Sequence, residues 1–264
     1  MACITLLTDF GTRDGYVGAM KGAMTSVHPG VDIHDVGHGL RQGDVRGAGQ
    51  ALARYWDRYP PGTVHVAVID PGVGTERRAM AVEVEQRYLV VPDNGLVSPV
   101  LESEQGWRAV SLENPEFFPV AASATFHGRD IFAPAAALLA RGLPLSRLGP
   151  QVLEPVLLDE SLPERGPEGV RGEVIGIDHF GNLITNVPGT ELEGAAELFL
   201  GDRPVPVART YGEVAPLHPL ALENSSGRVE VAVRNGSAAE LLDSGLGAPV
   251  FIPARKREPP TSPA

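Results

Sequence analysis

The chain has 264 residues, of which 43% are hydrophobic, enough for one large domain or two modest ones with a real core. Its 22 Lys and Arg against 33 Asp and Glu give a net charge of −11, and without basic clusters this argues against a nucleic-acid partner, whose phosphates bind mainly Lys and Arg. Its 31 glycines and 24 prolines stay below the share of about 25–30% typical of low-complexity chains, which indicates a folded protein with many turns.

The first part of the chain alternates between strand-like and helix-like segments. Residues 2–8 (ACITLLT) read as a buried strand, and the apolar spacing over residues 16–27 predicts a helix. Further strands are predicted at 31–36, 63–70, 79–85 and 87–93, and further helices at 44–58 and 130–141. This alternation predicts an α/β domain with a mainly parallel central sheet over residues 1–157.

The pattern changes near residue 155. Residues 158–169 include the charged, Pro- and Gly-rich run DESLPERGPEG and are predicted to be a linker. Short alternating segments separated by turn residues follow, and they predict a small antiparallel β domain over residues 170–254. We expect the last residues, 255–264, to be disordered.

The single cysteine, Cys3, excludes a disulfide within the chain and zinc sites rich in cysteine. Because Cys3 lies in an apolar run, we expect it to be a buried core thiol. No stretch approaches the ~20 apolar residues that span a membrane, and no basic lead precedes a long apolar segment at the N-terminus. We therefore expect a cytoplasmic protein with no membrane partner.

Three predicted strands end in turns that contain an aspartate, namely Asp9, Asp70 and Asp93. In open α/β sheets, ligands bind at the carboxyl ends of the strands. Asp70 is either a turn former or a site carboxylate, and Arg77 could reach back to pair with it. A carboxylate beside an arginine stays ionised and can orient a water or accept a proton. Arg78 competes for that role, or is a surface charge.

His127 lies in the run TFHGRD, just before the predicted helix at 130–141. A single histidine there is either a structural or surface residue or a catalytic group with Arg129 and Asp130 close behind. Asp130 could equally be the N-cap of the helix.

In the predicted β domain, the run DHFGN at 178–182 interrupts two strands and is either a plain turn or a binding loop. In a binding loop, Phe180 would stack on a flat ring and Asn182 would offer a donor and an acceptor to its edge. The runs at 224–227 and 234–237 look like turns and could supply backbone contacts. The sequence has no Walker A, GxGxxG or HExxH motif, and its seven histidines have no convincing metal-ligand spacing.

Six blocks in this order resemble the S-adenosyl-L-methionine (SAM) hydroxide adenosyltransferase family, the adenosine-forming SAM hydrolases, which are related to fluorinases and chlorinases. The blocks span about residues 4–250 and read TLLTDFGTRDGYVGAMKG, VIDPGVGTERR, PDNGL, FHGRDIFAPAAA, IDHFGNLITNV and NSSGRVEVAVRNGSAA. The resemblance implies that SAM and water give adenosine and L-methionine, without a metal ion or an organic cofactor. It also implies an N-terminal α/β domain, a C-terminal β-barrel-like domain, and a homotrimer with active sites between neighbouring subunits.

The resemblance also implies roles for individual residues. The catalytic set falls on Asp70, Arg77 and His127, and Asp9 matches the residue that holds the ribose hydroxyls. The remaining matches are substrate contacts: Asp14 and Asp178 near the cationic methionine amine, Phe180 and Asn182 at adenine, Ser226 at the methionine carboxylate, and Arg234 to Gly236 near the base.

Three alternatives to a SAM hydrolase stay open. A related halogenase would need a pocket for a desolvated halide, which Asp70 would repel, and residues 70–93 show no obvious inserted loop. A module that only binds SAM or adenosine would not need Arg77 or His127. A metal-dependent hydrolase would lose activity on chelation. This sequence departs from the family pattern at two positions. His179 stands where a basic residue is common, and Gly227 stands where the halogenases carry an arginine.

Overall fold

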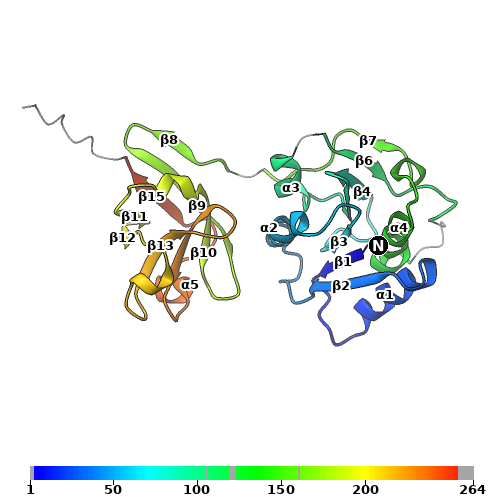
Figure 1. The fold of residues 1–264 in the computed structure, drawn as a ribbon, viewed down its shortest axis with the longest axis horizontal. Coiled ribbons are helices and arrows are strands. Elements are labelled where there is room, and N and C mark those ends of the chain that lie inside the picture. Colours follow the sequence, from blue (N-terminus) through cyan, green and yellow to red (C-terminus); the bar gives the residue numbers. More distant parts are fainter. Residues whose placement is uncertain (1–2, 105, 119–122, 160, 255–264) are drawn as a thin grey trace, which may run out of the picture. The chain divides into compact units, whose positions relative to one another are not determined.

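The structure is a computed structural model that describes residues 3–104, 106–118, 123–159 and 161–254. Contacts divide the chain into two compact units, Met1–Leu158 and Asp159–Ala264 (Figure 1). In the described residues, no helix is both long and apolar enough to cross a membrane. The segment 255–264, expected to be disordered, lies outside the described residues.

The N-terminal unit contains a sheet that is flanked by helices. Its elements are β1 (Cys3–Thr8), α1 (Tyr16–Val27), β2 (Asp32–Gly37), α2 (Val45–Tyr55), β3 (Val64–Val68), β4 (Ala79–Val84), β5 (Arg87–Pro92), α3 (Ser98–Ser103), β6 (Arg108–Ser111), α4 (Ala133–Ala140) and β7 (Gln151–Val152). Short 3₁₀ turns lie at Trp56–Arg58 and Leu145–Arg147, and a π-helical turn lies at Gly128–Phe132.

The described strands of this sheet run in the order β2-β1-β3-β5-β4-β6-β7. Strands β2, β1, β3 and β5 pair in parallel, and β4, β6 and β7 continue the sheet in antiparallel fashion. Successive residues of β1 face opposite sides: Leu6 belongs to the core under α1 and α4, and Leu7 to the core under α2 and α3. The mixed α/β fold expected from the alternating pattern is confirmed, with helices on both faces of the sheet (Figure 1).

The C-terminal unit is an antiparallel sheet that is nearly closed into a barrel. Its elements are β8 (Glu164–Gly166), β9 (Gly169–Ile177), β10 (Leu183–Pro188), β11 (Glu197–Leu200), β12 (Arg203–Pro206), β13 (Pro219–Glu223), β14 (Arg228–Val233), α5 (Ala238–Leu241) and β15 (Pro249–Pro253), with 3₁₀ turns at Gly189–Leu192 and Tyr211–Glu213. The strand order is β12-β11-β15-β9-β10-β14-β13, with β8 on β9. An isolated bridge between Val207 and Ala221 joins the two ends of this path.

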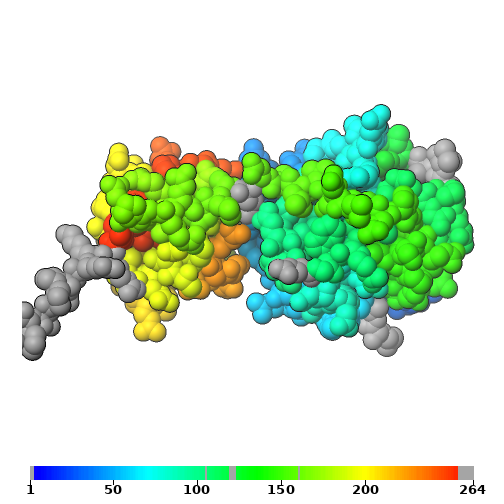
Figure 2. Space-filling view, turned by 90° about the horizontal axis from the view of Figure 1, so that it is seen from above, coloured from blue at the N-terminus to red at the C-terminus, as the bar shows by residue number. Residues whose placement is uncertain are grey.

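Several local features differ from the sequence expectations. The predicted linker carries strand β8, which pairs with the start of β9. The predicted helix at 44–58 is α2 followed by the 3₁₀ turn, and Asp44 caps α2 by accepting the N–H of Gly47 at 2.8 Å. Elements α3, β6 and β13 were not predicted, because they are short and show no clear period. Figure 2 shows one outer face of the N-terminal unit, on which the atoms form a continuous surface.

Candidate active site

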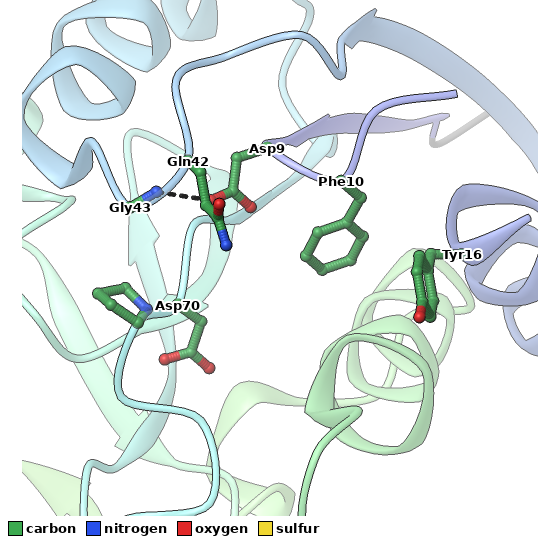
Figure 3. Close-up of a pocket in the computed structure, with 7 residues that line it drawn as sticks. Asp9, Phe10, Tyr16, Gln42, Gly43 and Asp70 are labelled. Atoms are coloured by element: carbon green, nitrogen blue, oxygen red, sulfur yellow. Dashed lines mark hydrogen bonds between the residues drawn. The ribbon is translucent and has the colours of Figure 1, made fainter. Parts of the chain in front are cut away.

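A cavity with both polar and aromatic lining lies at the carboxyl edge of the parallel strands. Strands β1 and β3 are neighbours in parallel register, with Thr8 opposite Val68, so the residues that follow them, Asp9 and Asp70, come to the same edge. The cavity has a volume of about 430 Å³ and is lined by Asp9, Phe10, Tyr16, Gln42, Gly43, Asp70 and Pro71. Figure 3 shows the two aromatic rings on one side of this cavity and the polar side chains on the other.

Asp9 is held in place by the loop between β2 and α2. The N–H of Gly43 donates to Oδ2 of Asp9 at 2.8 Å (Figure 3). Gly43 has a φ of +72°, in the left-handed region that glycine enters without strain. The loop therefore fixes one carboxylate oxygen of Asp9 beside the cavity.

Asp70 and Arg77 form a two-point ion pair, as the sequence reasoning anticipated. Nε of Arg77 donates to Oδ1 of Asp70 at 3.0 Å, and Nη2 of Arg77 donates to Oδ2. The two side chains are only 5% and 8% exposed, for Asp70 and Arg77 respectively. The amide of Asn94 donates to the carbonyl of Ile69 at 2.9 Å and so braces the end of the strand that carries Asp70.

The turn between Asp70 and Arg77 lies against the segment that carries His127. Gly74 has a φ of +79°, and a Cβ built on it would lie 2.5 Å from the carbonyl oxygen of Ala124. Only glycine permits so close a backbone approach in this conformation. This contact links two segments that are about fifty residues apart in the chain.

His127 completes a trio with Asp70 and Arg77. Nη2 of Arg77 lies 3.1 Å from Nδ1 of His127. A guanidinium group only donates hydrogen bonds, so Nδ1 accepts and the neutral ring carries its hydrogen on Nε2. Burial and the nearby Arg77 charge lower the pKa of His127, against weaker opposing effects of Asp70 and Asp130. The trio thus contains a neutral imidazole beside an ion pair.

Nη1 of Arg77 is a further donor at this place. It is buried and has no hydrogen-bond partner among the described residues. The guanidinium carbon of Arg77 also lies 5.5 Å from the ring centroid of Phe132. Buried donors in native proteins are normally satisfied, so this N–H suits a water or a substrate atom.

Arg78 and Asp130 do not have the roles that the sequence left open for them. Arg78 pairs with Asp93, whose side chain is 1% exposed, with Nε 2.8 Å from Oδ2. Asp93 also accepts the N–H of Val156, so this third strand-end aspartate is a structural group. Asp130 is not a helix cap, because it accepts the N–H of Ser123 at 2.9 Å and contacts Arg129.

Several cavity residues were not singled out from the sequence. Tyr16, Phe10 and Phe126 form an edge-to-face cluster, with Tyr16 and Phe126 ring centroids 5.3 Å apart. Gln42 and Gly43 lie in the loop after β2. Because β2 is parallel to β1, the end of β2 reaches the same edge of the sheet as Asp9. The position of these two residues just after a predicted strand was the feature of the sequence that could have identified them. Asp14, by contrast, is exposed in the turn before α1 and does not line the cavity.

In the C-terminal unit, the run 178–182 folds as a tight loop around one carboxylate. Asp178 accepts the backbone N–H groups of Phe180 and Asn182, each at 2.9 Å, and the side-chain amide of Asn182 at 3.0 Å. Asn182 is buried, whereas Phe180 is 72% exposed and presents its ring to solvent. The loop packs against the start of α5, where Ala239 donates to the carbonyl of Gly181.

The other expected contacts lie at the two ends of β14. Arg234 and Gly236 follow the strand, at the end where β10 begins and where the 178–182 loop lies. Ser226 precedes β14 and lies at the opposite end. Arg234 donates to the carbonyl of Val214 at 2.7 Å and holds the segment after Tyr211. Over the described residues, no group of three His, Cys, Asp or Glu side chains could hold a metal ion.

Comparison with known families gives two matches, one for each unit. The model of the SAM hydroxide adenosyltransferase N-terminal domain matches residues 4–149, and that of the SAM hydroxide adenosyltransferase C-terminal domain matches residues 172–251. Together the two models cover most of the chain.

Curated proteins and a solved structure are similar over 73% to 96% of the chain. An (R)-S-adenosyl-L-methionine hydrolase of Thermus thermophilus is 44% identical over 96% of this chain and 100% of the relative. An (R)-S-adenosyl-L-methionine hydrolase of Salinispora tropica is 43% identical over 90% of this chain and 93% of the relative. A fluorinase of an Actinoplanes species is 31% identical over 73% of this chain and 74% of the relative. A solved structure of an uncharacterized conserved protein from Thermotoga maritima has a TM-score of 0.87 and 36% identity, covering 94% of this chain and 99% of that chain.

Proposed function

The chain belongs to the SAM hydroxide adenosyltransferase family, and from that premise we propose that it is an enzyme that hydrolyses SAM to adenosine and L-methionine. The observation that carries the proposal is the contact of one arginine, Arg77, with both Asp70 and His127 beside the strand-end cavity. An ion pair and a neutral imidazole in contact are groups suited to holding and deprotonating water.

In the proposed reaction, a water oxygen attacks C5′ of the ribose in line with the C5′–S bond. As the C–O bond forms, the C5′–S bond breaks and its electron pair stays on sulfur, so methionine leaves as a neutral thioether. Asp70 accepts the proton that the water loses and later releases it to solvent. His127 donates its Nε2–H to the water oxygen and orients it. Positioning of this kind supplies much of the rate gain in such displacements.

Asp9 is proposed to accept hydrogen bonds from the ribose hydroxyls and thus fix the direction of attack. Its support is its place in the cavity next to Asp70 and the hydrogen bond from Gly43 that orients its carboxylate. The proposal includes neither a metal ion nor an organic cofactor, because a neutral leaving group needs no Lewis acid and the carbon centre undergoes no redox change.

The C-terminal unit is proposed to bind the base and the methionine end. Phe180 stacks on adenine, since its exposed ring is free for a planar partner. Asn182 and the Arg234–Gly236 segment contact the edge of the base. Asp178 and Asp14 are proposed to lie near the methionine amine. The carboxylate contact implied for Ser226 has no support from its position, because Ser226 lies at the far end of β14 from Asp178.

We further propose a homotrimer in which each site combines the N-terminal unit of one subunit with the C-terminal unit of its neighbour. The proposed contacts are split between two separate compact units, which is what such an arrangement requires. A cytoplasmic location is part of the proposal, because a chain with one cysteine, Cys3, suits a reducing compartment.

The test is to incubate the pure protein with SAM in H₂¹⁸O and to separate the products by chromatography with mass detection. The expected result is equal amounts of methionine and adenosine, with ¹⁸O on the adenosine 5′ position. Intact SAM, or cleavage without adenosine, would overturn the proposal. Parallel samples contain EDTA, chloride or fluoride: loss of activity with EDTA would favour a metal hydrolase, and 5′-halo-adenosine would favour a halogenase like the more distant fluorinase relatives.

A further inference from the structure

We propose that His38 is a positioning residue that ties the Asp9 loop (residues 9–11) to a series of hydrogen-bonded polar side chains running from Lys21 through Asp35 to Thr8. The inference rests on the proposed function, in which Asp9 holds the ribose hydroxyls. His38 itself does not line the cavity, so its effect on substrate would pass through the residues on either side of Asp9.

The polar chain is continuous. Nδ1 of His38 lies 2.9 Å from Oγ1 of Thr8, and Nε2 of His38 lies 3.0 Å from Oδ1 of Asp35. The other carboxylate oxygen of Asp35 accepts from Nζ of Lys21 at 2.6 Å. The His38 side chain is 6% exposed, so both of its nitrogens satisfy their hydrogen bonds within the protein.

The hydrogen bonds that end on Asp35 have a defined direction. Burial raises the pKa of Asp35 and hydrogen bonds from Lys21 and His38 lower it, and the net result is a pKa below the ordinary value. Asp35 is therefore an ionised acceptor, and Nε2 of His38 carries the hydrogen. A neutral ring with its hydrogen on Nε2 presents Nδ1 as an acceptor to the Thr8 hydroxyl, and the Thr8 oxygen is then left to accept from the backbone.

Two hydrogen bonds from backbone N–H groups connect this series of polar side chains to the Asp9 loop. The N–H of Phe10 donates to Oγ1 of Thr8 at 3.3 Å, and the N–H of Gly11 donates to the carbonyl of His38 at 2.7 Å. The backbone is therefore tied to His38 on both sides of Asp9. Together with the hydrogen bond from Gly43, these contacts hold the Asp9 carboxylate in one orientation.

The experiment compares two substitutions of Thr8, one that replaces its hydroxyl by a methyl group and one that keeps the hydroxyl and removes the methyl group. Thr8→Val keeps the shape but removes the link to His38, and Thr8→Ser keeps the link. Calorimetry on the full chain measures the affinity for adenosine and for 2′,3′-dideoxyadenosine, which lacks the hydroxyls that Asp9 would hold. Thr8→Val is expected to lower the affinity for adenosine about tenfold, the scale of one net hydrogen bond. Its affinity for the dideoxy compound is expected to stay within about twofold of the wild-type value. Thr8→Ser is expected to match the wild type.

Asp35→Ala is a second variant, and its side chain is 45% exposed, so the substitution leaves the core intact. Like Thr8→Val, it is expected to lower the affinity for adenosine and not the affinity for the dideoxy compound, but by a smaller factor. Equal weakening of both nucleosides by these variants, or no change in either, would overturn the role of the polar chain. If wild-type protein binds neither nucleoside, the proposed function fails and this inference fails with it.

Discussion

The same nitrogen of Arg77, Nη2, contacts Oδ2 of Asp70 and lies 3.1 Å from Nδ1 of His127. Its two hydrogens are thus shared between a carboxylate and an imidazole that are 57 positions apart in the chain, from 70 to 127. Arg77 therefore sets the orientation of both groups at once, and burial together with its positive charge lowers the pKa of the imidazole.

Replacement of any member of this trio should abolish most of the turnover. Asp70→Asn, Arg77→Met and His127→Ala are each expected to lower kcat for SAM hydrolysis by about 10²-fold or more, the scale of positioned acid–base groups. Adenosine release measured by chromatography gives kcat. Arg78→Met is the matched control, since Arg78 contacts Asp93 and not the trio. Wild-type turnover in the three variants would remove the assigned roles.

His127 should titrate below the ordinary histidine pKa of 6.5. Burial and Arg77 disfavour the imidazolium, so Arg77→Met should raise the pKa toward or above that value. NMR titration of the His127 ring resonances measures the pKa in the wild type and in the Arg77→Met variant. By linkage, the contribution of this group to stability is present above pH 6.5 and is lost as the pH falls through the lower folded-state pKa. A wild-type pKa above 6.5 would contradict the arrangement.

Gly74→Ala should disturb catalysis more than Gly72→Ala. A Cβ at position 74 would lie 2.5 Å from the Ala124 carbonyl oxygen and would need a strained φ, whereas a Cβ at position 72 meets its nearest atoms at 3.5 Å. Displacement of the His127 segment by a fraction of an ångström is expected to lower kcat about tenfold or more in the first variant. Equal kcat values in the two variants, measured with the adenosine assay, would rule out this coupling.

Arg78→Met should reduce stability and leave kcat unchanged. It removes the ionic partner of Asp93, whose side chain is 1% exposed, and an unpaired buried carboxylate is costly. Because Arg78 is 42% exposed, water offsets part of the loss, and the free energy of unfolding should fall by about 1–3 kcal/mol. Urea unfolding measures it. A variant as stable as the wild type would show that Asp93 finds another partner.

Subunit mixing tests the proposed sites between neighbours. Asp70→Asn and Asn182→Ala each inactivate a site from a different unit of the chain. In co-expressed mixed trimers, about one quarter of the sites would join an intact N-terminal unit to an intact C-terminal unit, and activity should recover to about that fraction. Activity no higher than that of the separate variants would place each site within one subunit.

Much of the site followed from local pattern. Asp9 and Asp70 were visible because each follows an apolar run, and parallel neighbours bring such ends together at one edge. The pairing of Arg77 with Asp70 was also anticipated, since seven residues and a Gly-rich turn are enough to reverse the chain. The predicted linker, however, carries β8, because a three-residue strand is too short to show a period and is stabilised by its partner β9.

The apolar periodicity, the glycine turns and the positions of the aspartates were properties of short segments, and the chain's residue order alone specified them. The partners of Arg78 and His38 were not, because strand pairing decides them: pairing of β4 with β5 brings Arg78 beside Asp93, and pairing of β1 with β2 brings His38 beside Thr8. The hydrogen bond of Asp130 with Ser123 depends on how the chain folds into the π-helical turn before α4. Charged side chains next to one another in sequence, such as Arg77 and Arg78, therefore separate into one that contacts the catalytic groups and one that supports the fold. Burial amplifies that difference, since a charge removed from water needs a partner in a fixed place.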